Sequence, residues 1–277
     1  MLFRSPARHG NRFDALDGLR TIAVGLVVLF HVSAPRMAAG FLGVDMFFVL
    51  SGFLITSGLI AQVERTGRIS LGDFWSRRIK RLMPAALLVV CVVLVWAGKF
   101  ALVHRRDNLS LDAWYTIFYL ANWRFIGSAS YFENDGTVSP LLHMWSLAVE
   151  EQFYIFWPLL IAGFTWLVLR VFRAGNRNAV RVLAGVAVVI IVVSAVLLAV
   201  LYAPRAAERA YMGTDAKAFE PMLGALLAIL AANPRFAAWC TRCARFLFWG
   251  GAVSTVALFA VLDGPAPFYF QIGRAHV

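Results

Sequence analysis

Charged residues are scarce in this 277-residue chain: they make up 15% of it, whereas hydrophobic residues make up 61%. A soluble globular domain carries about a quarter charged residues and about half apolar ones, so the composition excludes an ordinary soluble domain. The apolar residues come in long blocks, each close to the length that a membrane-spanning helix requires. We therefore predict an all-α polytopic membrane protein.

Acidic residues are scarcer than basic ones, with 15 Asp and Glu against 26 Lys and Arg, for a formal net charge of +11. A basic balance can indicate nucleic-acid binding, but here the basic residues cluster between the apolar blocks. The positive-inside rule predicts this distribution for cytoplasmic loops. We therefore assign the charge to membrane topology and expect no nucleic-acid partner.

Cysteine is rarer still, with only Cys91, Cys240 and Cys243 in the chain. Cys240 and Cys243 have the C-x-x-C spacing of metal and redox sites, but neither a second pair nor a nearby histidine completes a zinc site. We expect two free thiols in a cytoplasmic loop and no metal. No small-residue cleavage site follows the first apolar run, so we expect that run to remain as the first span.

The apolar blocks predict about seven spans of roughly 20 residues. They cover residues 19–34, 41–61, 84–103, 141–169, 182–202, 218–232 and 246–262. Arg8 and Arg12 place the N-terminus in the cytoplasm, and the arginine-rich stretch 64–82 forms a cytoplasmic loop. Segment 112–125 does not fit a single crossing between these loops, so we expect a re-entrant or interfacial helix there.

Both ends of the chain read as translated sequencing adaptor, at residues 2–5 and 272–277. We expect residues 1–12 to form a cytoplasmic N-terminal segment, which includes the first of these stretches. Residues 13–271 are expected to form a transmembrane domain that is incomplete at its C-terminus. We leave the tail at 272–277 out of the functional assignment.

The first apolar block contains Arg20 and His31, which are eleven residues apart. That spacing is close to three helical turns, so both side chains lie on one helix face, about 16 Å apart. An ionisable side chain within a span is costly and marks a functional site. Imidazole titrates near neutral pH, which suits His31 to general acid–base catalysis, and Arg20 suits a phosphate group. The structural alternatives are a histidine bonded to a neighbouring carbonyl and an arginine that reaches the membrane surface.

Other polar residues inside spans are few, which makes them candidates for the same site. The second span carries Asp45 and Ser51, and the fourth carries Glu150 and Glu151, with His143 at its external end. Adjacent helical residues point about 100° apart, so at most one of the two glutamates faces His31. We expect Glu150 to hold the His31 tautomer and Glu151 to face another helix; the alternative is an acidic pair near the outer leaflet.

Three arginines precede Pro84 in the basic stretch: Arg77, Arg78 and Arg81. If this stretch is helical, Arg77 and Arg81 share a face, whereas Arg78 points about 100° away. Guanidinium groups suit bidentate phosphate recognition. The alternatives are ordinary positive-inside topology and attraction to anionic lipids.

In four motifs, the chain resembles the acyltransferase 3 family. The motifs occur in family order between Asp14 and Gly224: Arg20-x10-His31, the run from Phe47 to Ile55, Arg77-Arg78-x2-Arg81-x2-Pro84, and Trp145-Ser146-Leu147-x2-Glu150-Glu151-Gln152-Phe153-Tyr154. The resemblance implies a multi-pass protein of the bacterial inner membrane with about ten spans, each of roughly 20 residues. The predicted domain at 13–271 therefore lacks the final spans.

The resemblance also implies an activity. An acyl group, usually acetyl, passes from cytoplasmic acyl-CoA to a hydroxyl of an extracytoplasmic glycan such as O-antigen, peptidoglycan or exopolysaccharide. His31 is then the catalytic residue, and Arg20, Arg77, Arg78 and Arg81 serve acyl-CoA, with no bound cofactor. Residues 139–145 and 215–217 resemble members fused to an SGNH-hydrolase-like domain, although Lys217 replaces the arginine of many relatives.

These residues favour acyl transfer as the function. We expect the CoA phosphates to bind the cytoplasmic arginines and the thioester to reach His31, which either deprotonates the acceptor hydroxyl or is itself acylated. Asp45, Ser51, Glu151 and His143 are expected to bind substrate. The main alternative is a proton-coupled transporter of a small solute, because buried Arg, His and Glu also form proton relays. A membrane anchor for a soluble domain would leave these residues unexplained.

Overall fold

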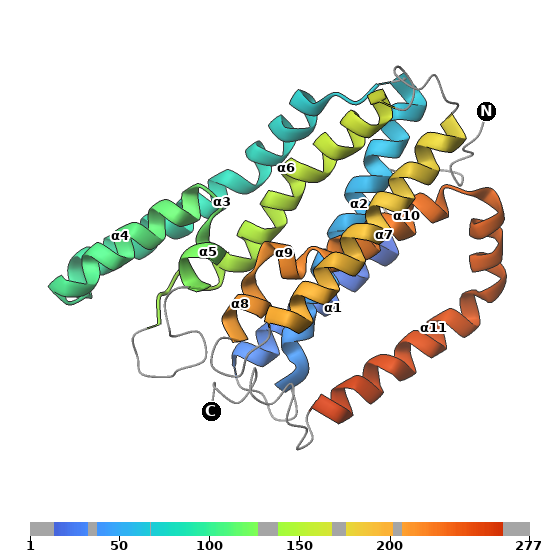
Figure 1. Ribbon diagram of the computed structural model, residues 1–277. Coiled ribbons are helices and arrows are strands. Elements are labelled where there is room, and N and C mark those ends of the chain that lie inside the picture. The colour runs from blue at the N-terminus through green and yellow to red at the C-terminus, as the bar shows by residue number, and fades with distance from the viewer. Residues whose placement is uncertain are drawn as a thin grey trace. The chain divides into compact units, whose positions relative to one another are not determined.

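The computed structural model describes residues 14–32, 38–66, 68–126, 138–167, 176–201 and 207–262. Every regular element within these ranges is a helix, which confirms the all-α prediction (Figure 1). The predicted N-terminal segment 1–12, both adaptor-like stretches and residues 263–271 of the predicted domain lie outside the described residues. The chain divides into two compact units, which we describe separately.

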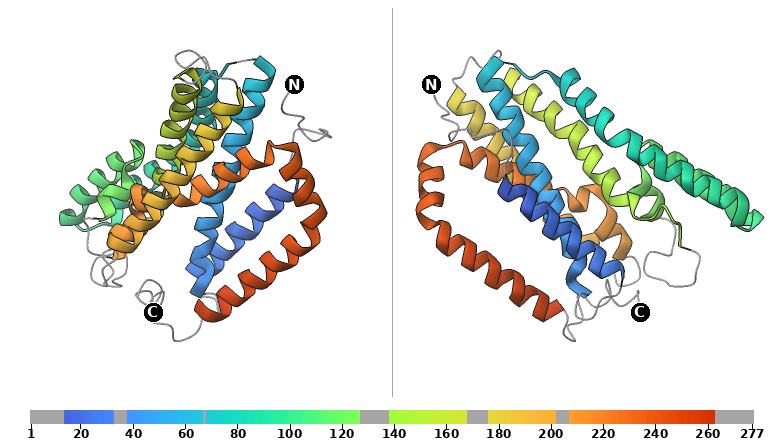
Figure 2. Two further views of the ribbon diagram at one scale, coloured as in Figure 1. Left: turned by 45° about the vertical axis from the view of Figure 1, so that its right-hand side comes forward. Right: turned by 180° about the vertical axis from the view of Figure 1, so that it is seen from behind.

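Unit 1 is organised around the pairing of α2 with α10, two helices distant in sequence that lie against each other. Its elements are α1 (Asp14–His31), η1 (Ala38–Phe41), α2 (Leu42–Thr66), the part of α7 (Asn176–Leu201) up to Val192, α10 (Phe219–Ala231) and α11 (Pro234–Leu262). After α10 the chain turns by 105° into α11, which contacts η1 (Figure 2).

Glycines allow α2 and α10 to touch at backbone level. A Cβ atom on Gly52 would lie 1.8 Å from the carbonyl oxygen of Pro221, and one on Gly224 would lie 1.9 Å from that of Val49. Helices in lipid associate through close packing at small residues, because lipid supplies little hydrophobic driving force. The Ser51-Gly52 pair therefore marks the α2–α10 contact.

We expect Gly52→Ala to destabilise the protein, because the added methyl group meets the backbone of α10, which cannot move aside as a side chain can. The expected loss is about 1–3 kcal/mol, the usual range for overpacking. Thermal unfolding in detergent measures it. The matched control is Gly58→Ala in the same helix, where an added Cβ meets no atom within 4 Å; equal melting temperatures for the two variants would contradict this account.

Helix α1 packs on the start of α2 through two further glycines. Gly40 faces the carbonyl of Leu26, and Gly43 faces that of Ala23, each at 2.4 Å from the position of an added Cβ. Ala23 is fully buried at this contact. The packing fixes one side of α1, the helix that ends at His31, against η1 and α2.

Unit 2 contains α3 (Leu71–Phe100), α4 (Val103–Ile117), α5 (Ala121–Ile126), α6 (Met144–Trp166) up to Ala162, the end of α7, α8 (Ala207–Met212) and α9 (Thr214–Lys217). Helix α4 doubles back along α3 (Figure 1). As a result, the hydroxyl of Tyr119, just after α4, lies 4.0 Å from the sulfur of Met83.

The segment predicted to be re-entrant or interfacial, 112–125, forms a helical hairpin in the structure. It comprises the end of α4, a tight turn and α5. Tyr119 in the turn has a φ of 54°, and an ion pair of 2.9 Å between Arg124 and Asp112 bridges the two helices. The segment therefore reverses direction within unit 2, and its re-entrant or interfacial placement in the membrane stays a prediction.

The third span was predicted to begin at Pro84, which is wrong, because α3 begins at Leu71 and continues through Pro84. The cytoplasmic location of residues 64–82 stays a prediction. Ser70 is the N-cap residue, and its hydroxyl donates a 2.6 Å hydrogen bond to Asp73. A proline removes one backbone donor, but neighbouring groups compensate for this in membrane helices. The three arginines therefore lie on a helix.

Four helical segments are long and apolar enough to cross a membrane: 39–66, 71–100, 144–166 and 180–201. The bent pair 214–231 and 234–258 is a fifth candidate, as a broken span or a re-entrant loop. Helix α1 adds 18 residues, with its Asp and Arg side chains in the first two turns. The protein is therefore a multi-pass membrane protein, and the count of about seven spans stays a prediction.

Candidate active site

Arg20 and His31 lie on one continuous helix, α1, as predicted. Arg20 is half-buried, and its guanidinium lies 3.5 Å from the carboxylate of Asp17, one turn earlier. His31 is the last residue of α1, so it lies at the end of this helix and not within it, and residues 33–34 of the predicted span lie outside the described residues. Its ring is exposed on the surface of the chain, edge-on to Phe30 at 5.4 Å between ring centroids.

A main-chain carbonyl of the same helix orients the His31 ring. Nδ1 lies 2.8 Å from the carbonyl oxygen of Val27. A carbonyl only accepts, so Nδ1 carries the hydrogen, and in the neutral ring Nε2 has the free lone pair. The group that fixes this tautomer is therefore Val27. A catalytic role for Glu150 stays a prediction.

Two predicted residues of α2 also belong to unit 1. Asp45 is half-buried in the first turn, and Ser51 is buried at the contact with α10. Two further polar residues that the sequence did not single out, Thr56 and Glu220, are buried in the same unit. Glu220 had a detectable signal, since a carboxylate within an apolar span is rare. The substrate-binding roles of Asp45 and Ser51 stay predictions.

Arg78 of α3 points in a different direction from Arg77 and Arg81, as the spacing predicts. Arg77 and Arg81 are exposed, whereas Arg78 is half-buried. The guanidinium carbon of Arg78 lies 3.5 Å from the centre of the Tyr154 ring and 5.3 Å from that of Phe74. Arg78 is therefore stacked against α6, and only Arg77 and Arg81 present an open face.

Tyr154 is the main link between α3 and α6 in unit 2. Its ring stacks under Arg78, and its carbonyl oxygen accepts a 3.0 Å hydrogen bond from the indole of Trp75. Its hydroxyl donates a hydrogen bond to Glu150. These contacts come from one residue of the Trp145–Tyr154 motif. The motif therefore has a structural role that its spacing did not reveal.

The neighbouring glutamates have different surroundings, as predicted. Glu150 is half-buried, whereas Glu151 is only 7% exposed, and its Oε1 makes no hydrogen bond with any residue the structure describes. Glu151 lies within electrostatic reach of Arg78. His143, the other site candidate of this unit, is exposed just before α6. The roles of Glu151 and His143 in substrate binding stay predictions.

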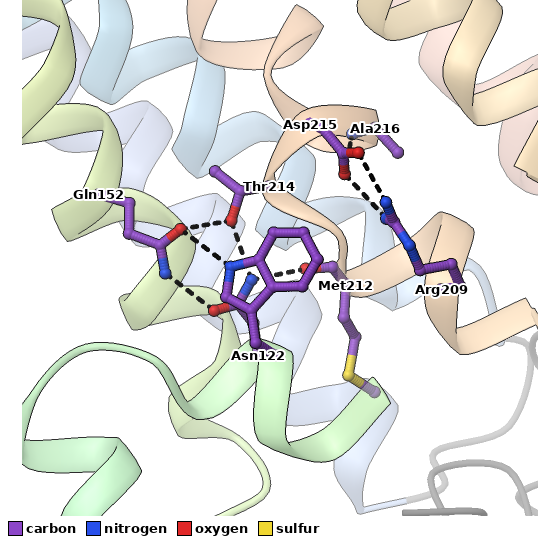
Figure 3. Close-up of polar contacts among 8 residues, drawn as sticks. Asn122, Gln152, Arg209, Met212, Thr214, Asp215 and Ala216 are labelled. Atoms are coloured by element: carbon purple, nitrogen blue, oxygen red, sulfur yellow. Dashed lines mark hydrogen bonds and ion pairs between the residues drawn. The ribbon is translucent and has the colours of Figure 1, made fainter. Parts of the chain in front are cut away.

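A closed network of buried amides joins α5, α6 and α9 next to these residues (Figure 3). The Asn122 amide donates to the Met212 carbonyl at 3.0 Å and to the Thr214 hydroxyl at 2.9 Å. The Gln152 amide donates to the Tyr119 carbonyl at 2.7 Å and to the Asn122 oxygen at 2.9 Å. Thr214 donates back to Gln152 at 2.6 Å. Each amide thus uses both donor hydrogens and its acceptor, so the network fixes these helices in one arrangement.

We expect Asn122→Leu to lower the melting temperature, because the side chain is fully buried and its loss leaves several polar partners unsatisfied. Each unsatisfied group costs about 1–3 kcal/mol. The control is Asn108→Leu, at an exposed asparagine of the same unit. If the two variants unfold at the same temperature in detergent, the network does not stabilise the fold.

An ion pair between Arg209 and Asp215 lies beside this network. The Arg209 guanidinium donates two hydrogen bonds to the carboxylate of Asp215, at 2.8 and 2.6 Å (Figure 3). These bonds raise the pKa of Arg209 above its usual value. Lys217 is buried, with its ammonium 4.7 Å from the Tyr211 ring centre. Residues 215–217 were identified by resemblance, but their partner Arg209 was overlooked.

No cluster of three or more histidine, cysteine or acidic residues suitable for a metal ion occurs in the described ranges. The polar residues thus form two groups. Unit 1 carries Arg20, His31, Asp45 and Ser51, and unit 2 carries Arg77, Arg78, Arg81, Glu150, Glu151 and His143. The first group offers an oriented imidazole, and the second offers exposed guanidinium groups and a buried carboxylate. This chemistry suits proton transfer or nucleophilic catalysis and the binding of an anionic group.

Known proteins share much of this sequence. A family described as "Acyltransferase domain" matches residues 13–274. YrhL of Bacillus subtilis (strain 168) is 41% identical over 229 residues, which are 80% of this chain and 34% of YrhL. The O-acetyltransferase OatA of Staphylococcus aureus (strain NCTC 8325) is 40% identical over 218 residues, 78% of this chain and 34% of OatA.

A further relative is the peptidoglycan O-acetyltransferase OatA of Listeria monocytogenes (strain EGD-e), which is 39% identical over 228 residues, 80% of this chain and 35% of that protein. The chain thus spans about a third of the length of these curated relatives. No solved structure matches the chain.

Proposed function

Because the chain belongs to the acyltransferase 3 family, we propose that it moves an acetyl group from cytoplasmic acyl-CoA to a hydroxyl of a cell-envelope glycan, with peptidoglycan as the first choice. All three relatives are named as O-acetyltransferases, which supports acetyl transfer, and the names of two specify peptidoglycan. The observation that carries the proposal is the orientation of His31, whose Nδ1 is bonded to Val27 so that Nε2 is left to react. The relatives' names favour an enzyme over the transporter.

His31 can serve the transfer in two ways. As a base, Nε2 takes the proton of the acceptor hydroxyl while that oxygen attacks the thioester carbonyl, and CoA leaves as a thiolate. As a carrier, Nε2 itself attacks the thioester, CoA leaves, and the acceptor hydroxyl then displaces the acyl group from the imidazole. In both cases the bond to Val27 stabilises the developing positive charge on the ring.

The other predicted residues fill supporting roles in this proposal. Arg77 and Arg81 bind CoA phosphates, because they are exposed and one helical turn apart. Arg20 assists acyl-CoA use from the first turns of α1. Glu150, Asp45, Ser51 and His143 contribute polar groups to the catalytic and substrate-binding surfaces. The N-terminus lies in the cytoplasm, since the basic residues before α1 follow the positive-inside rule.

Inverted membrane vesicles containing the chain and lipid-linked glycan, supplied with acetyl-CoA labelled in the acetyl group, test the function. We expect label on the glycan and stoichiometric release of CoA. Vesicles without the chain are the control. Uptake of an intact solute into the vesicles, with no consumption of acetyl-CoA, would indicate a transporter and contradict the proposal.

A further inference from the structure

We propose that Arg78, Glu151 and the rings of Tyr154 and Tyr119 form an internal binding site for an uncharged, hydrogen-bond-donating part of a substrate, separate from the phosphate-binding face of Arg77 and Arg81. The site lies within unit 2, where α3, α6 and the α4–α5 turn come together. This inference rests on the proposed function, because the ligand is assigned to one of the two substrates of acetyl transfer.

Arg78 differs from its two neighbours in direction and in surroundings. It is half-buried over the Tyr154 ring, with its guanidinium carbon 3.5 Å from the ring centre, whereas Arg77 and Arg81 are exposed. When a guanidinium stacks on an aromatic ring, one of its faces is covered by the ring. Its N–H groups then remain available to partners that lie in the plane of the guanidinium. Arg78 is therefore directed into unit 2.

Glu151 gives the site its vacant acceptor. The residue is only 7% exposed, and no residue of the described chain donates a hydrogen bond to its Oε1. Arg78 is near enough to act on it electrostatically, yet the two side chains form no direct ion pair. Leaving a buried acceptor unsatisfied costs about 1–3 kcal/mol, so this oxygen calls for a donor beyond the described residues, which a bound substrate can supply.

Tyr119 closes the site on a third side. It is half-buried in the α4–α5 turn and lies within electrostatic reach of Glu151. Its φ of 54° is unusual for a residue with a side chain, and the Gln152 amide holds its carbonyl at 2.7 Å. Strained residues held by their surroundings occur at ligand sites more often than elsewhere.

The charges of the site determine what it binds. Arg78 is the one guanidinium of the site and is accompanied by two carboxyl groups, Glu150 and Glu151, so the site offers a phosphate few donors and does not suit it. A neutral O–H or N–H donor satisfies Glu151, and its carbonyl or ether oxygen can accept from Arg78. Both proposed substrates contain such groups: the amides of the pantetheine arm of acyl-CoA, and the hydroxyl and acetamido groups of the glycan.

Direct binding to the full chain in lipid nanodiscs tests the site without requiring turnover. The probes are acetyl-pantetheine, which lacks phosphate, and an N-acetylglucosamine–N-acetylmuramic acid disaccharide. We expect Glu151→Met, which removes the acceptor at similar volume, to weaken binding of one probe by about tenfold or more, with a smaller effect for Glu151→Gln. Whichever probe is weakened identifies the source of the donor. Glu64→Gln, at an exposed glutamate of α2, is the matched control.

Arg77→Gln with Arg81→Gln completes the test. This double variant is expected to weaken binding of CoA but to leave the affected probe unchanged. The proposal is overturned if the wild-type chain binds neither probe. It is also overturned if both Glu151 variants keep the wild-type melting temperature and bind both probes as the wild type does. A third contradicting result is that the double variant and Glu151→Met weaken binding of the same probe equally. A wild-type chain that binds a probe but transfers no label would refute the proposed function alone.

Discussion

Replacing His31 with alanine is expected to reduce acetyl transfer to glycan by at least about a hundredfold, within the range that general acid–base catalysis contributes. The reason is that Nε2 is the only nitrogen of this ring left free by the bond between Nδ1 and Val27. Alanine removes both nitrogens while leaving the helix intact, since His31 is the last residue of α1 and is exposed. The initial rate of label transfer in vesicles measures the loss.

The neighbouring variant Val32→Ala serves as control for His31→Ala, since it shortens another exposed side chain at the end of the same helix. We expect it to retain nearly full activity. Acid quenching after a single turnover separates the two roles of the histidine: label bound to wild-type protein but not to His31→Ala identifies a carrier, and unlabelled protein identifies a base. Wild-type rates in His31→Ala would disprove the catalytic assignment.

Neutralising the exposed arginine face of α3 is expected to have the second largest effect. In Arg77→Gln with Arg81→Gln, the KM for acetyl-CoA should rise at least about tenfold to a hundredfold, because even one hydrogen bond to a charged group contributes about 1.5–3 kcal/mol net of water. The kcat should change little, since these contacts are made equally before and during the chemical step. Initial rates over a range of acetyl-CoA concentrations give both constants.

The control for this double variant is Lys99→Gln, which removes one positive charge from the opposite end of α3 at an exposed position. It should leave the KM unchanged. Acetyl-pantetheine provides a second comparison, because a donor without phosphate groups gains nothing from these arginines. An equal rise in KM for acetyl-CoA and acetyl-pantetheine would show that the arginines do not act through phosphate.

Much of the helical framework was predictable from the sequence, because long apolar blocks have few alternatives in a membrane. Each of the seven predicted spans overlaps a helix of the structure, and the segment 112–125 was recognised as irregular. The errors fell at helix boundaries, where local patterns are weak. Pro84 was taken as the start of a helix that in fact begins at Leu71, and the first helix was extended past His31.

The candidate site was predictable only as a set of residue types. Spacing on a helix correctly separated Arg78 from Arg77 and Arg81, because the angle between residues of one helix follows from its geometry. It could not show that Arg78 stacks on Tyr154, because the two residues lie 76 positions apart on different helices. Asn122 and Thr214 were missed because a small polar side chain has no recognisable sequence pattern, and their partners also lie far away in the sequence.

The sequence by itself determined that this is an α-helical membrane protein, that it carries an Arg–His pair on its first helix, and that its motifs are those of an acyltransferase. These properties follow from composition, helical periodicity and local spacing. Only the tertiary structure decided which polar groups are satisfied and which are not. Hydrogen bonding and burial depend on contacts between distant helices. Such contacts closed the network around Gln152 and left Oε1 of Glu151 without a donor among the described residues.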